Sequence, residues 1–62
     1  MTLQENIDRL EALQRQAEEL RRRLEACDSP EEAADLVTQF DAVVKDLIEA
    51  IDAAKREADA QP

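Results

Sequence analysis

The 62-residue chain has no glycine, histidine, tryptophan or tyrosine, and only one cysteine, one phenylalanine and two prolines. A single cysteine cannot form a disulfide within the chain, and without histidine a structural zinc site lacks its usual ligands. The absence of glycine turns and the single aromatic residue argue against a β-sheet. We therefore expect no metal and no cofactor, and we expect helix packing or oligomerisation to stabilise so short a chain.

Charge and hydropathy exclude further classes of protein. The net charge is −8 and the isoelectric point is near 4.3, which opposes non-specific binding to nucleic acid or to an anionic membrane. No apolar run is long enough to cross a membrane, and no basic start followed by an apolar segment indicates a signal peptide. A lone cysteine fits a reducing compartment, so we expect a cytoplasmic protein without a membrane partner.

The segment CDSPEE, residues 27–32, interrupts two long runs of helix-favouring residues. Ser29 suits an N-cap, Pro30 suits the first helical position, and Glu32 completes the Ser-x-x-Glu pattern of a capping box. Thr2 and Glu5 repeat the pattern at the start of the chain. The sequence thus predicts two capped helices.

The predicted organisation is a single all-α domain that covers the whole chain, 1–62. Because only about two residues connect the helices, they are expected to lie antiparallel as a helical hairpin. Asp28 is expected to take the left-handed conformation that glycine usually supplies in such a turn. The predicted elements are a helix at about 3–26, a turn at 27–29, a helix at about 30–58, and a frayed tail at 59–62.

Apolar residues in both predicted helices recur at the three- and four-residue steps of a coiled coil. In the second helix, one such stripe runs through Val37, Val44 and Ile51, and we call it the first stripe. An antiparallel pairing in which residue numbers add to about 57 sets this stripe against the apolar row of the first helix. The predicted hairpin core is Leu10, Leu13, Ala17, Leu20, Leu24, Val37, Val44 and Ile51.

Asn6 is the one polar residue in this pattern, since the pairing sets it against Ile51. A buried asparagine can specify the register of a coiled coil. The interpretation we favour places Asn6 half-exposed near the open end of the hairpin, with Ile7 turned inward in its place.

The second helix also carries a second stripe, which is distinguished from the first by Leu36, Val43 and Ala50, and the first helix has no second apolar row to match it. One hairpin covers one stripe only, so the other is expected to contact a second copy of the chain and form a four-helix bundle. An antiparallel two-fold axis would then bring Val43 near its own copy; the side of Ile7 and Ile48 is the alternative interface. The predicted dimer contact is Leu36, Phe40, Val43, Leu47 and Ala50.

No arrangement of residues indicates catalysis. Cys27 has no histidine to activate it, and paired carboxylates need a cleft with unlike environments, which a slim bundle does not offer. The run Arg21–Arg23 has glutamates within helical reach and no aromatic neighbours for nucleic-acid bases. We expect a protein that is not an enzyme. The second helix has an acidic face, which we expect to be solvated; the alternative is that it docks a basic partner or mimics a nucleic-acid backbone. The face consists of Asp35, Asp41, Asp46, Glu49, Asp52 and Glu57.

The layout is similar to that of the Rop proteins, which are small plasmid RNA-binding proteins, in length, mid-chain turn and expected dimeric bundle. Their RNA-binding face carries lysines, amides and a phenylalanine, and these have no counterpart in this chain. The chain also resembles the small subunit of exonuclease VII, a short acidic helical hairpin, although the aromatic residue and glycine of that family's second helix are not matched. The outer face of the first helix here carries Asp8, Glu11, Arg15, Glu18 and Arg22.

Two classes of function remain after these exclusions. The first is a non-enzymatic, self-associating interaction module or accessory subunit. Its expected partner is a second copy of the chain, with another protein as the alternative. The second, implied by the resemblances, is a Rop-like regulator or an accessory subunit of a nucleic-acid enzyme.

Overall fold

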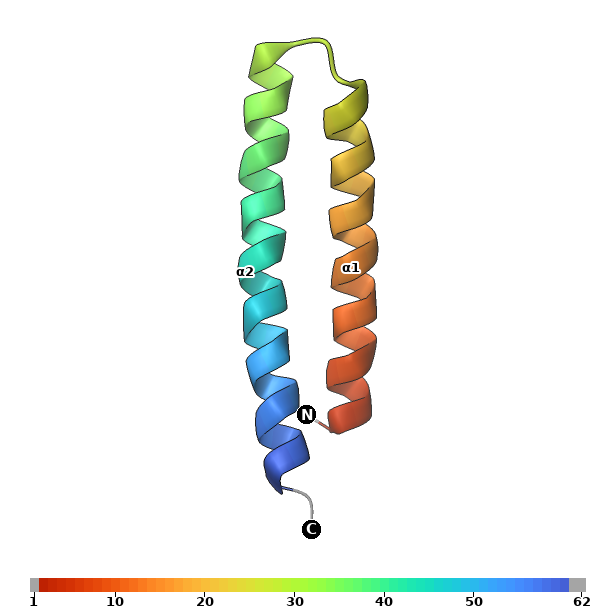
Figure 1. Cartoon of the computed structure of the whole chain (residues 1–62), viewed down its shortest axis with the longest axis vertical. Coiled ribbons are helices and arrows are strands. Elements are labelled where there is room, and N and C mark those ends of the chain that lie inside the picture. Colours follow the sequence, from red (N-terminus) through yellow and green to blue (C-terminus); the bar gives the residue numbers. More distant parts are fainter. Residues whose placement is uncertain (1, 61–62) are drawn as a thin grey trace.

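The computed structural model describes residues 2–60 and shows an all-α helical hairpin, which confirms the predicted fold class. Helix α1 spans Leu3–Ala26 and helix α2 spans Pro30–Ala60. The helices run antiparallel side by side, joined by a short turn at one end (Figure 1). The hairpin is a rod with principal extents of 51 × 14 × 13 Å.

Side-chain caps begin both helices. Thr2 forms a complete capping box with Glu5: the Thr2 hydroxyl accepts from the Glu5 backbone N–H at 3.1 Å, and the Thr2 backbone N–H donates to Glu5 Oε1 at 3.3 Å. At α2, the Ser29 hydroxyl accepts from the Glu32 backbone N–H at 3.4 Å, and the Ser29 carbonyl accepts from Ala33 N–H at 2.9 Å. Ser29 therefore acts as the N-cap of α2, through a longer hydrogen bond than the one at Thr2. The return hydrogen bond from Ser29 N–H to the Glu32 carboxylate is absent among the described residues, so only half of the predicted capping box forms.

The turn corrects one expectation about the backbone. Cys27 closes α1 in an extended conformation, with φ −77° and ψ 144°, and no residue between 2 and 60 has a positive φ. Asp28 therefore does not take the left-handed conformation. Since Pro30 already favours an extended residue before it, the chain reverses without a left-handed position.

Helix α2 also continues to Ala60, two residues past the expected end at 58. The segment 58–60 has neither glycine nor proline, so no residue in it breaks the helix. The last two residues of the expected tail, 61–62, lie outside the described residues.

The seam, meaning the row of side chains packed between the two helices, contains six buried residues at heptad spacing. Each helix contributes three, and antiparallel partners have numbers that add to 56: Leu20 with Leu36, Leu13 with Val43, and Asn6 with Ala50. Partly buried residues pack against this cluster, namely Leu10, Ala17, Leu24, Cys27, Phe40 and Leu47.

This seam shows that the two stripes of α2 were assigned the wrong way round. Leu36, Val43 and Ala50, predicted at a dimer contact, are buried inside the hairpin, while Phe40 and Leu47 flank them. Val37 and Ile51, predicted in the hairpin core, are 52% and 46% exposed, and Val44 is only half-buried. The five predicted core residues of α1 lie in the seam or against it: Leu10, Leu13, Ala17, Leu20 and Leu24.

Asn6 gives a physical reason why the second stripe of α2, and not the first, lies in the seam. It is 1% exposed, whereas Ile7 is exposed, so the expectation that Ile7 would replace it in the seam is also wrong. If the first stripe of α2 formed the seam, as predicted, the Asn6 amide would pack against the bulky side chain of Ile51. Facing the second stripe, it meets Ala50, which is 0% exposed and small enough for the two backbones to approach closely. The match in size between Asn6 and Ala50 therefore favours the second stripe as the buried face of α2.

Candidate functional site

The exposed part of the first stripe is the most prominent apolar surface of the hairpin. Ile48 is 54% exposed on α2, and Val37 and Ile51 of the same helix are exposed to a similar degree. Residues seven apart on a helix lie almost in line, so Val37, Val44 and Ile51 form one row, and Ile48 extends it outward. We call this surface the outer apolar row: Val37, Val44, Ile48 and Ile51.

The two flanks of the seam carry different side chains. In an antiparallel pair of right-handed helices, the residue that follows each seam residue turns toward the same flank on both helices. On this flank, Ile7 of α1 joins Ile51 and the rest of the outer apolar row, and both isoleucines are exposed. The opposite flank has a groove of about 400 Å³ that is lined by Leu20 and Val43 of the seam together with polar side chains of both helices, among them Gln16, Arg23 and Gln39. The flank with the outer apolar row therefore displays the exposed isoleucines Ile7, Ile48 and Ile51.

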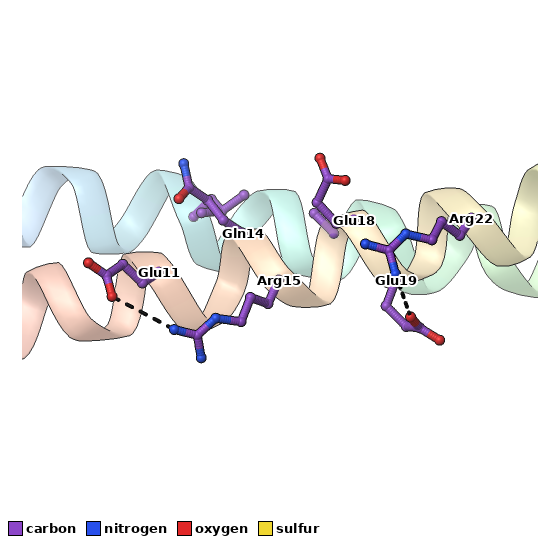
Figure 2. A pocket seen from close by; sticks show the side chains of 8 residues that line it. Glu11, Gln14, Arg15, Glu18, Glu19 and Arg22 are labelled. Carbon is purple, nitrogen blue, oxygen red and sulfur yellow. Dashed lines mark ion pairs between the residues drawn. The ribbon is translucent and has the colours of Figure 1, made fainter.

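The outer face of α1 carries several ion pairs between residues three or four positions apart. A groove of about 750 Å³ extends from this face to Ala17 and to Leu47 of α2, and its charged side chains lie over the helix surface without converging on one point (Figure 2). Within it Arg15 pairs with Glu11 at 3.8 Å, and Arg22 pairs with Glu19 at 3.7 Å. The groove is lined by Glu11, Gln14, Arg15, Ala17, Glu18, Glu19, Arg22 and Leu47.

The arginine run is likewise engaged within α1. Arg21 donates to Glu25 at 2.6 Å and to Glu18 at 3.1 Å. The hydrogen bond to Glu18, followed by the charge of Glu25, raises the pKa of Arg21 further above its ordinary value. Arg23 lies 3.6 Å from Glu19. Because each of these cations has an acidic neighbour, this face carries no concentrated positive charge for a phosphate backbone.

Residues 2–60 also show no group of acidic, histidine or cysteine side chains that could hold a metal ion. Cys27 is a free, half-buried thiol that packs against the seam beside the turn. None of the helices in the described part of the chain is long and apolar enough to span a membrane.

Comparison with protein-family models, with curated proteins and with solved structures finds no match to this chain. The fold places the chain among all-α helical hairpins, and the outer apolar row is its candidate functional surface.

Proposed function

We propose that this protein is a non-enzymatic, self-associating interaction module in which two hairpins pack into a four-helix bundle. The observation that carries the proposal is the outer apolar row, because a single flank of a charged rod displays Ile48, Ile51 and Val37 to solvent. Isolated exposed apolar residues are ordinary on protein surfaces, but several of them aligned along one side of a helix are typical of an interface.

The elongated shape of the hairpin supports a contact with a second chain. Its radius of gyration is 14.5 Å, whereas a compact domain of this length has one of about 10.5 Å. Its accessible surface is 4721 Å², about 700 Å² more than is usual for a folded protein of this mass. A standard protein interface buries about 800 Å² on each partner. The excess surface of one hairpin is thus about what one interface would cover.

The energies favour an association of moderate strength. The outer apolar row is about half covered already, so complete burial of Val37, Ile48 and Ile51 on two chains contributes about 5–9 kcal/mol. Association costs about 4–15 kcal/mol in lost freedom. Since these ranges overlap, we expect a dimer that dissociates on dilution, and an accessory protein that could reuse the same face for another helical partner.

The proposal is tested with Ile48→Glu, which puts a charge in the middle of the outer apolar row. Ala42→Glu is the matched control, because Ala42 is an exposed residue of α2 outside both the row and the seam. Sedimentation equilibrium gives the dissociation constant of each variant, and circular dichroism reports its helicity. We expect Ile48→Glu to raise the dissociation constant at least about 100-fold, or about 2.7 kcal/mol, and Ala42→Glu to change it little. Equal dissociation constants for the two variants would contradict the proposal.

A further inference from the structure

The outer apolar row belongs to a larger pattern of two parallel heptad rows on α2. The first consists of Val37, Val44, Ile51 and Ala58. The second, one step further around the helix, consists of Ala34, Asp41, Ile48 and Lys55. Val44 is half-buried and the other members are exposed, so both rows are available to a partner. The second row is apolar at Ile48, with opposite charges one heptad away on either side.

This charge pattern is self-complementary under one symmetry operation. When a second α2 packs antiparallel with a two-fold axis at Ile48, Ile48 meets its own copy. Val44 then lies across from the partner's Ile51, and Val37 from the partner's Ala58. In the second row, Asp41 lies across from the partner's Lys55, and the symmetry repeats this pair at the other end. From Val37 to Ala58, each layer is therefore either apolar against apolar or acid against base.

The neighbouring arrangements lack this property. An antiparallel register centred on Val44 sets Asp41 against the partner's Ile48, which places a carboxylate in the apolar contact. An antiparallel register centred on Ile51, one heptad further along, sets Ile48 against the partner's Lys55. A parallel arrangement brings each Asp41 to its own copy, and like charges at that distance repel. Only the antiparallel register centred on Ile48 avoids both defects.

We propose that a second copy of this chain docks antiparallel on this face, with the two-fold axis at Ile48 and an Asp41–Lys55 ion pair on each side. The inference rests on the proposed function and adds the orientation and register of the contact. Asp41 pairs with Lys45 at 3.2 Å within its own helix and has a second carboxylate oxygen to offer the partner. Exposed ion pairs contribute little affinity, so their part is to select this register over the others.

Disulfide trapping tests the position of the axis, in a Cys27→Ala background that removes the native thiol. A disulfide requires Cβ atoms about 3.8 Å apart, so a cysteine close to the axis links to its own copy most readily. In a glutathione redox buffer, we expect Ile48→Cys to form the linked dimer at least about tenfold faster than Val44→Cys. A mixture of Val44→Cys and Ile51→Cys chains should form the mixed disulfide. Faster self-linkage at Val44 than at Ile48 would overturn the proposed register.

Charge exchange tests the ion pairs, with the dissociation constant of the dimer as the readout. Asp41→Lys and Lys55→Asp, each made alone, create two like-charge contacts per dimer and should raise that constant about 3- to 30-fold. The double variant restores opposite charges and should return to within about threefold of the native value. Within one helix the two positions are about 21 Å apart, beyond the screening length of physiological salt, so rescue requires contact between chains.

The outcomes separate the two proposals. A native chain that is monomeric at every concentration would defeat the proposed function and this inference together. A native dimer in which the double variant is no better than the single variants would leave self-association standing and overturn the antiparallel register.

Discussion

Replacing Asn6 with leucine should stabilise the hairpin, although it removes the only buried polar side chain among the described residues. Asn6 is 1% exposed, and its Oδ1 has no hydrogen-bond partner within residues 2–60. A buried acceptor without a partner costs about 1–3 kcal/mol. Leucine branches at Cγ as asparagine does and is larger, so Asn6→Leu removes that cost without leaving a cavity.

Thermal unfolding followed by circular dichroism measures the effect, at equal chain concentrations because association raises the melting temperature. We expect Asn6→Leu to melt higher, by about 4–8 °C for each kcal/mol gained. Asn6→Asp keeps the shape and adds a charge, so it serves as the control and should melt lower than the native chain. A lower melting temperature for Asn6→Leu than for Asn6→Asp would refute the burial of this side chain in the seam.

Three further predictions concern the turn, the first capping box and the arginine run. Ser29→Ala should cost about 0.5–1 kcal/mol in urea unfolding, the low end for an N-cap, because the Ser29 hydrogen bond is long at 3.4 Å; an unchanged midpoint would remove Ser29 from the cap. The pKa of Glu5 is lowered because its carboxylate accepts hydrogen bonds from the Thr2 backbone and then from the Thr2 hydroxyl. The stabilisation from this box is therefore present above the ordinary value of 4.5 and is lost as the pH falls through the lowered pKa, so Glu5→Gln should flatten the acid side of the melting-temperature profile. Duplex RNA and DNA should show no gel shift at physiological salt; a salt-sensitive shift abolished by Arg21→Glu would instead support the Rop-like alternative.

Most of the fold follows from local signals in the sequence. Thr2, Ser29 and Pro30 mark the helix starts because capping and proline geometry act over three or four residues. The three- and four-residue spacing of the leucines in α1 likewise predicts the face that this helix buries. These features depend on neighbours along the chain, which the sequence displays directly.

The rotation of α2 about its own axis could not be read in the same way. Its apolar arc contains both stripes, and Phe40, Leu47 and Ala54 are common to them, so periodicity alone does not choose between Leu36 and Val37. The choice depends on how sizes match across the seam, and the pairing of Asn6 with Ala50 was the available clue. Once the second stripe turns inward, the candidate site moves around α2, from the row of Val43 to the rows of Val44 and Ile48.

The central claim is that the outer apolar row is the contact between two copies of the chain. Sedimentation equilibrium of the native protein, from micromolar to millimolar concentration, tests it most directly. The predicted result is a mass that rises with concentration toward twice the chain mass of 7.0 kDa, with Ile48→Glu remaining at the single-chain mass over the same range. A native mass of one chain at every concentration, together with a cooperative melting transition, would contradict the claim.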